Sequence, residues 1–118
     1  MIKFSGQLVY LACGATDMRK QINGLAATVE KSFKLSPFQP ALFVFCNRRR
    51  NRLKVLEWDR DGFWLYFKRL ERGHFSWPIA KDDEATITLT DAEFSTLLGA
   101  TSVERLVRRE QVNPTSVG

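Results

Sequence analysis

Hydrophobic and polar positions along the first half of the chain predict a strand, a helix and a second strand. Residues 7 to 13 form an apolar run that ends at Gly14, which is typical of a buried strand. Between Met18 and Phe33 apolar residues recur at helical spacing, so we expect a long helix with one face on the core, capped by Thr16 or Asp17. Residues 41 to 46 are continuously apolar, a pattern that predicts a central strand covered on both faces.

The second half of the chain is expected to be mainly β-structure. Strands are predicted at about 52 to 58, 63 to 70 and 86 to 89, and the capping-box pattern at residues 90 to 93 predicts a short helix that ends near Gly99. A chain of 118 residues is long enough for one core. We therefore predict an α+β fold with a mainly antiparallel sheet, one long helix and one short helix. It forms a single domain over residues 1 to 110, followed by a flexible tail at 111 to 118.

The turn at residues 59 to 62 sets the expected pairing of the two middle strands. Its Asp-Arg-Asp-Gly sequence predicts a type I turn followed by a left-handed glycine. If Asp59 then pairs with Phe63, Lys54 lies directly opposite Lys68. Like charges in such a pair destabilise a sheet by up to roughly 1 kcal/mol, so we interpret them as favouring a functional basic surface. The same register pairs Glu57 with Leu65, Val55 with Phe67 and Leu53 with Arg69 on an apolar face toward the core.

Positive charge is concentrated in the same region. The chain has a net charge of +5, which favours an anionic partner, and the whole excess lies between residues 48 and 72. Folding the strands back gathers the cations near the loop at 47 to 51. There they would neutralise phosphates, while the rings of Trp64 and Tyr66 would stack on exposed bases. The predicted phosphate contacts are Arg48, Arg49, Arg50, Arg52, Lys54, Lys68, Arg69 and Arg72.

A second basic pair lies near the expected start of the long helix. Arg19 and Lys20, together with free backbone amides there, would hold a phosphate. The alternative is that Asp17 simply caps the helix and both long side chains lie in water. The arginine loop likewise also fits an ordinary solvated turn, with the aromatic residues in the core or in an interface.

Residues for catalysis or metal binding are few. The only histidine is His74, and Cys13 and Cys46 are far apart in the sequence, so no zinc spacing is present. Asp59 and Asp61 could hold Mg²⁺, but turn chemistry explains both. We expect no catalytic residue, no cofactor and no metal. There is no signal peptide and no apolar run of eighteen residues, so we expect a cytoplasmic protein without a membrane partner.

Several short motifs follow one another in a fixed order over about residues 8 to 98. They are Val9-Tyr10-Leu11, residues 14 to 20, Gly24-Leu25-Ala26, residues 42 to 45, residues 52 to 56, Trp58-Asp59, Asp61-Gly62, residues 68 to 71 and residues 73 to 78. Together they resemble the motifs of the TnpB accessory proteins of bacterial insertion sequences of the IS-66 class. The resemblance implies a small bacterial protein that is encoded beside a transposase and supports transposition, while the catalytic acids belong to the transposase.

Three functional hypotheses follow. The first is a noncatalytic accessory factor in DNA transposition that binds DNA, expected at insertion-sequence ends, through a basic hairpin end backed by aromatic rings. The second is a protein-interaction module without direct DNA binding that docks the transposase or another element-encoded protein, with Trp58, Trp64 and Trp77 as anchors. The third is a nuclease, which predicts metal-dependent cleavage that is lost when Asp59 or Asp61 is changed.

Overall fold

The computed structural model of the chain describes residues 6–80 and 83–99. The predicted α+β fold, with a mainly antiparallel sheet, one long and one short helix, is confirmed. The predicted domain boundary at residue 110 and the predicted tail at 111 to 118 lie outside the described residues. The elements are β1 (Leu8–Ala12), α1 (Ile22–Thr28) continued by the π-helical segment η1 (Val29–Phe33), β2 (Ala41–Cys46), β3 (Arg52–Asp59), β4 (Gly62–Arg69), β5 (Thr86–Leu89) and α2 (Asp91–Gly99).

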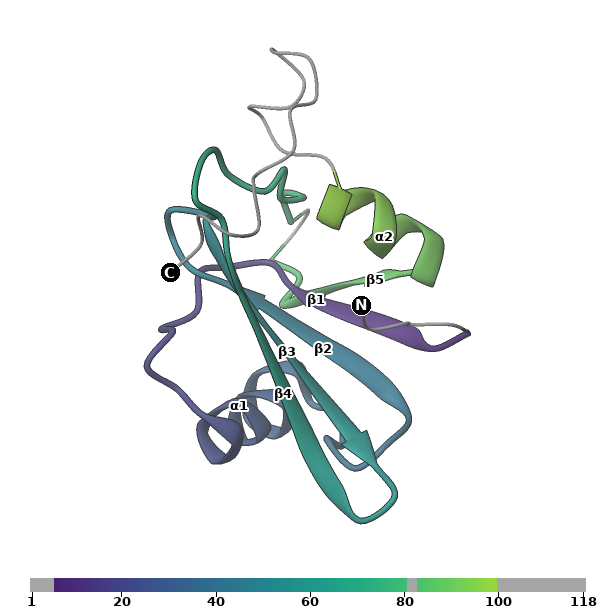
Figure 1. Cartoon of the computed structure of the whole chain (residues 1–118). Helices are drawn as coiled ribbons and strands as arrows, with labels where there is room; N and C mark the ends of the chain where they lie inside the picture. The colour runs from purple at the N-terminus through teal and green to yellow at the C-terminus, as the bar shows by residue number, and fades with distance from the viewer. Residues whose placement is uncertain (1–5, 81–82, 100–118) are drawn as a thin grey trace.

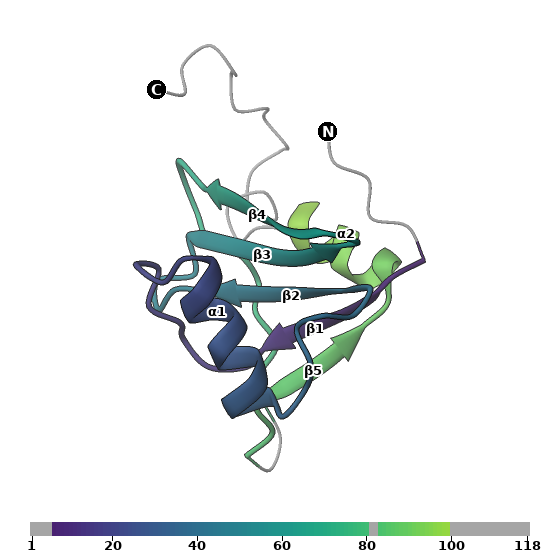
Figure 2. The same ribbon diagram turned by 90° about the horizontal axis from the view of Figure 1, so that it is seen from below.

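The described strands form one five-stranded sheet with α1 on one face and α2 on the other (Figure 1, Figure 2). The strand order is β4-β3-β2-β1-β5. β1 and β2 are parallel, and the remaining neighbours are antiparallel. Two parallel strands need a long crossover connection, and the segment with α1 and η1 supplies it between β1 and β2.

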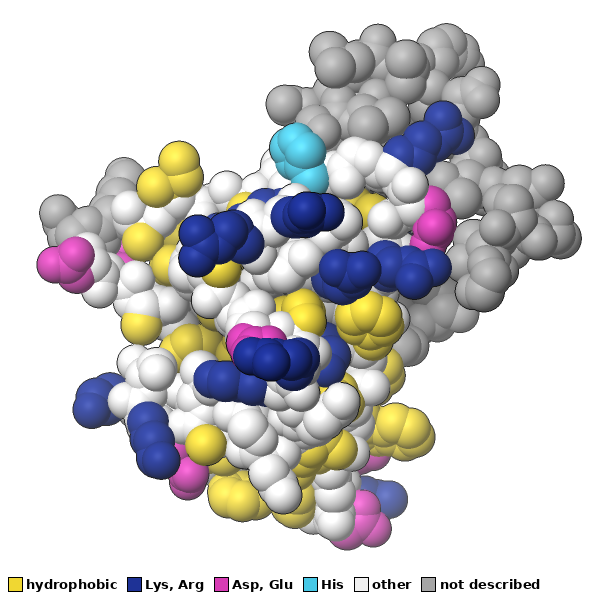
Figure 3. All heavy atoms as spheres, turned by 90° about the vertical axis from the view of Figure 1, so that its left-hand side faces the viewer, with side chains coloured by type: hydrophobic (Ala, Val, Ile, Leu, Met, Phe, Trp, Pro, Cys, Tyr) yellow, Lys and Arg dark blue, Asp and Glu magenta, His cyan; other side chains and the backbone are white. Residues whose placement is uncertain are grey.

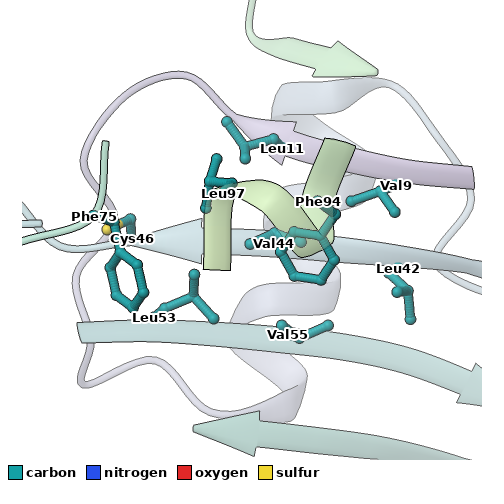
Figure 4. Close-up of a cluster of buried hydrophobic side chains, with 10 residues drawn as sticks. All are labelled: Val9, Leu11, Leu42, Val44, Cys46, Leu53, Val55, Phe75, Phe94 and Leu97. Atoms are coloured by element: carbon teal, nitrogen blue, oxygen red, sulfur yellow. The ribbon is translucent and has the colours of Figure 1, made fainter. Parts of the chain in front are cut away.

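The core lies on both sides of β2, whose six residues are all buried. One apolar cluster lies beneath α2 and includes Phe94 (Figure 4). The other cluster contains Phe43 and Phe45 from β2 together with Leu25 of α1. Alternate β2 side chains therefore enter opposite layers, as expected for a strand of period two. The prediction of a central strand covered on both faces is confirmed.

The two helices begin differently. The capping box of α2 is confirmed, because the Glu93 amide donates to Thr90 Oγ1 (3.0 Å) and the Thr90 amide donates to Glu93 Oε1 (2.8 Å). In contrast, α1 begins at Ile22, so the predicted cap at Thr16 or Asp17 is wrong. The Asp17 carboxylate instead accepts a bond from the Arg19 amide (2.9 Å), a local bond that favours a turn over a helix.

The register of the β3–β4 hairpin differs by one residue from the prediction. Asp59 pairs with Gly62, and a two-residue turn of Arg60 and Asp61 connects the strands. Arg60 adopts the left-handed conformation, with φ 54°, that we expected of Gly62, and two-residue hairpin turns require positive φ. The predicted opposition of Lys54 and Lys68 is therefore wrong. The pairs are Lys54 with Phe67, Leu53 with Lys68 and Arg52 with Arg69.

Candidate nucleic-acid interface

The loop between β2 and β3 is held from within by two asparagines. Asn47 Oδ1 accepts hydrogen bonds from the amides of Asn51 and Arg52 (3.0 Å each), and Asn47 Nδ2 donates to Asn51 Oδ1 (2.8 Å). The Arg50 amide donates to the Asn47 carbonyl (3.1 Å). These hydrogen bonds hold the loop backbone in place without using the side chains of Arg48 and Arg49. Both arginines are exposed at the tip of the loop.

Cations from four separate segments gather around this loop. Arg52 and Arg69 are directly paired at the adjoining ends of β3 and β4, and Arg19 shares a groove with Arg52. The backbone of the segment after β4 is bonded to the loop, since the Leu70 amide donates to the Asn51 carbonyl (2.8 Å). Figure 3 shows many lysine and arginine side chains and few acidic ones on this side of the molecule. We define the basic end as Arg19, Arg48, Arg49, Arg52, Lys68, Arg69 and Arg72.

Two of these cations have carboxylate partners. Arg19 bonds Asp17 (2.8 Å) and Arg69 bonds Glu71 (2.9 Å), and all four side chains are exposed. The hydrogen bonds from Arg19 lower the pKa of Asp17 to about 2. Exposed ion pairs contribute little to stability, so an incoming phosphate can compete with them. Within residues 6–80 and 83–99, the other five members of the basic end form no ion pair.

Two of the predicted phosphate contacts are engaged by the protein itself instead. Lys54 is only 6% exposed, and its Nζ donates to the carbonyls of Met18 (2.9 Å) and Lys20 (2.8 Å). The Arg50 guanidinium lies over the Trp77 ring, 5.4 Å from its centroid. Both side chains hold neighbouring segments against the sheet, so we leave them out of the basic end.

Lys20, which was paired with Arg19 in the prediction, is exposed on the flank of α1. Its Nζ donates to Thr28 Oγ1 (3.0 Å). The α1 helix starts after this residue, so the predicted phosphate site on free helix amides beside Arg19 and Lys20 does not form in the expected place.

The two aromatic side chains predicted to stack on bases lie beside carboxylates. Trp64 and Tyr66 are parallel, with centroids 6.2 Å apart. The Trp64 Nε1 donates to Asp59 Oδ2 (3.0 Å), and the Tyr66 hydroxyl donates to Glu57 Oε1 (2.8 Å). Burial, followed by the bond to Glu57, raises the pKa of Tyr66 to about 12. The expectation that these rings back the cations is therefore wrong.

A different ring lies among the cations. Phe67 is 54% exposed and pairs with Lys54, whose Nζ is 5.9 Å from the ring centroid. It lines a groove of about 670 Å³ between β3, β4 and the turn before α1; the other lining residues are Asp17, Met18, Arg19, Gln21, Arg52, Lys54 and Leu65. Sequence reasoning missed Phe67 because the expected register placed it on the core side, and only the correct turn length could have revealed it.

The three tryptophans expected to anchor a protein partner have different surroundings. Trp58 packs edge-on against Phe38 and Phe63, with centroids 5.1 and 5.0 Å away. Trp77 donates from Nε1 to the Ala12 carbonyl (2.9 Å). Trp64 is 55% exposed and is therefore the most accessible of the three.

Two further kinds of feature are absent from the described part of the chain. Residues 6–80 and 83–99 contain no group of three or more His, Cys, Asp or Glu side chains placed to hold a metal ion. Among those residues, no helix has the length and apolar character needed to span a membrane.

Comparisons with known proteins give one family and two relatives. The sequence profile described as IS66 Orf2-like protein matches residues 7–108. The uncharacterized protein y4hO of Sinorhizobium fredii is 39% identical over 110 residues, which cover 93% of this chain and 92% of that protein. The uncharacterized protein y4jC of the same organism is 33% identical over 112 residues, which cover 95% and 94% of the two chains. No solved structure is significantly similar.

Proposed function

This chain belongs to the IS66 Orf2-like family, which implies an accessory role in transposition, and we propose that it fulfils that role by binding DNA directly through its basic end. We expect the DNA to be the ends of the insertion sequence. In this proposal the chain works with the transposition machinery and cuts no strand itself.

The observation that carries the proposal is a group of accessible cations without carboxylate partners. Four of them are exposed and Arg52 is half-buried, and none forms an ion pair with any described residue; the five are Arg48, Arg49, Arg52, Lys68 and Arg72. The like-charged pair of Arg52 and Arg69 in the hairpin costs a few tenths of a kcal/mol up to about 1 kcal/mol. A polyanion would relieve this repulsion, and releasing its counterions would favour binding.

The proposed contacts are to phosphates, and they position DNA without reading its sequence. The arginines at the loop tip are well placed for this, because the Asn47 and Asn51 side chains fix the backbone beneath them. Arg19 and Arg69 would exchange their exposed carboxylate partners for phosphate oxygens. Bidentate guanidinium–phosphate bonds are stronger than neutral hydrogen bonds.

The test compares two triple variants that remove the same positive charge. The first variant, R48A/R49A/R52A, changes the basic end. The control variant, K31A/K34G/R60G, changes exposed cations elsewhere, and it uses glycine at Lys34 and Arg60 because both have positive φ. Binding of each purified chain to labelled duplex DNA is measured by fluorescence anisotropy. We expect the first variant to bind more than about tenfold more weakly and the control to bind like the unmodified chain.

Docking on the transposase is the second candidate function, favoured by the exposure of Trp64. An exposed tryptophan is a typical anchor of a protein interface. This alternative predicts that the purified chain binds DNA only when the transposase is present, and that Trp64→Ala weakens the complex with the transposase. Binding of DNA by the chain alone would favour direct contact.

A nuclease activity stays a prediction with a simple test. Asp59 already accepts the bond from Trp64, and the described part of the chain contains no group of three or more His, Cys, Asp or Glu side chains placed to hold a metal ion. Metal-dependent cleavage that disappears in Asp61→Asn would contradict the accessory role proposed here.

A further inference from the structure

The groove beside α1 contains a buried positive charge with no acidic partner. The ammonium of Lys54 is bonded to the carbonyls of Met18 and Lys20, and no described carboxylate forms an ion pair with it. A buried charge is costly unless it is compensated. Two carbonyl dipoles compensate only part of it, so the groove retains a positive potential.

The other charged groups of the groove add to this potential. Arg52 and Arg19 also line it. Its one carboxylate, Asp17, is already bonded to the Arg19 guanidinium (2.8 Å). The balance therefore favours an anion, and guanidinium groups are suited to phosphate.

One wall of the groove is apolar and carries an exposed ring. Phe67 lines it together with Leu65 and Met18. Aromatic side chains in a positively charged groove are the usual means of binding unpaired bases, because every base has a flat face that can stack. The volume of about 670 Å³ lies within the range typical of small-molecule sites.

We propose that this groove binds an unpaired nucleotide of single-stranded DNA, with the base against Phe67 and the adjoining phosphates on Arg52 and Arg19. This inference rests on the proposed function, since it names the form of DNA that the basic end prefers. A paired base would not fit, because its faces are covered by its neighbours in the stack. The DNA ends processed in transposition would have to be opened or frayed to fill the groove.

The chain provides a matched control on the same strand. Trp64 is exposed to the same extent as Phe67, but it pairs with Glu57 and donates to Asp59, on the opposite face of the sheet. Carboxylates repel phosphates. A base that stacked on Trp64 would therefore bring the adjoining DNA phosphates close to the carboxylates of Glu57 and Asp59. Loss of Phe67 and loss of Trp64 should thus have different effects on binding.

The experiment measures binding of Phe67→Ala and Trp64→Ala to three labelled probes of one length. The probes are a single strand, the matching duplex, and a single strand of abasic nucleotides, which keeps the sugars and phosphates but lacks the bases. Phe67→Ala is expected to weaken binding to the single strand about fivefold or more, with less than a twofold effect on the duplex and the abasic strand. Phe67→Trp should restore binding, and Trp64→Ala should change binding to each probe less than twofold. Circular dichroism of each variant checks that it is folded.

Three outcomes would overturn the inference. They are equal losses from the two variants, a Phe67→Ala loss of the same size on the abasic strand, and no effect of Phe67→Ala on the single strand. If duplex DNA is still bound through Arg48 and Arg49 in these cases, the proposed function stands and only the groove assignment fails. If no probe is bound by the unmodified chain, both fail.

Discussion

The two ends of the β3–β4 hairpin have opposite electrostatics and are also organised differently. At the turn end, two acidic side chains are engaged by the protein itself: Glu57 accepts from Tyr66 and Gln7, and Asp59 accepts from Trp64. At the other end, most exposed cations have no partner within residues 6–80 and 83–99. There the fold is stabilised by groups that stay inside, namely Asn47 and Lys54.

This difference distinguishes charged and polar groups that stabilise the fold from exposed cations that are free to bind a ligand. Polar groups that are bonded internally reduce the conformational freedom of the hairpin, and their loss should lower stability. Exposed cations that the fold does not need should contribute little to stability, and their loss should affect binding. Four substitutions test this separation, in order of decreasing effect.

Asn47→Ala should destabilise the protein most among these substitutions. It removes three half-buried hydrogen bonds that close the loop between β2 and β3, and at about 1 kcal/mol each the expected loss of unfolding free energy is roughly 2–3 kcal/mol. Chemical denaturation measures it. The control is Asn23→Ala, an exposed asparagine on α1, which should change the unfolding free energy by no more than about 0.5 kcal/mol. Equal losses of unfolding free energy in the two variants would contradict the role of Asn47 in closing the loop.

Lys54→Met should cost about 2 kcal/mol of unfolding free energy. Methionine keeps the apolar length of the side chain, but the carbonyls of Met18 and Lys20 lose their donor. Lys68→Met, on the exposed neighbouring strand, should stay within about 0.5 kcal/mol. Thermal or denaturant unfolding of both variants gives the comparison, and a larger effect at Lys68 would reverse the assignment of buried and available cations.

Tyr66→Phe should cost about 1 kcal/mol through loss of the bond to Glu57. It should also change the pH dependence at high pH. Because the pKa of Tyr66 is raised to about 12 in the folded chain, above the ordinary value near 10, its contribution is fully present below pH 10 and is lost between pH 10 and 12. Chemical denaturation across this pH range should show a decline in unfolding free energy. The decline should be absent in Tyr66→Phe and present in Tyr10→Phe. A decline that is the same in both variants would contradict this account.

Asp17→Asn should have the smallest effect, and it should act on binding. It removes the carboxylate that pairs with Arg19 at the groove, so DNA binding should become about two- to threefold tighter at low salt and the gain should fade at high salt. Anisotropy titrations at two salt concentrations measure it. Weaker binding in this variant would mean that the Asp17 turn is needed to place Arg19.

Part of this architecture could be predicted from the sequence because the signals were local and redundant. The six continuous apolar residues of β2 are most simply explained by a strand covered on both faces, and the capping-box residues at the start of α2 form the two reciprocal bonds that the pattern predicts. The gathering of cations around the loop at 47 to 51 followed from antiparallel pairing alone, since a shift of one residue leaves the ends of the strands in place.

The faces of the hairpin could not be predicted, because they depend on the length of one turn. Gly62 at the fourth position suggested a bulge, but Arg60 takes the left-handed conformation and Gly62 starts β4. A shift of one residue exchanges which side chains of a strand pair share a face. It therefore exchanged the roles of Phe67 and Tyr66, and it replaced the expected Lys54–Lys68 pair with the pair of Arg52 and Arg69. The start of α1 was predicted wrongly for a related reason. The turn before it is held by a hydrogen bond from the buried Lys54, which is distant in the sequence.

The most direct test of the central claim is the salt dependence of DNA binding by the purified chain. Each phosphate contact adds about 0.9 to the slope of log affinity against log salt concentration on duplex DNA. Relative to the unmodified chain, we predict a slope that is shallower by about 2–3 for R48A/R49A/R52A and unchanged for K31A/K34G/R60G. The same slope for all three proteins, or an equal decrease in both variants, would contradict the claim that the basic end is the DNA-binding surface.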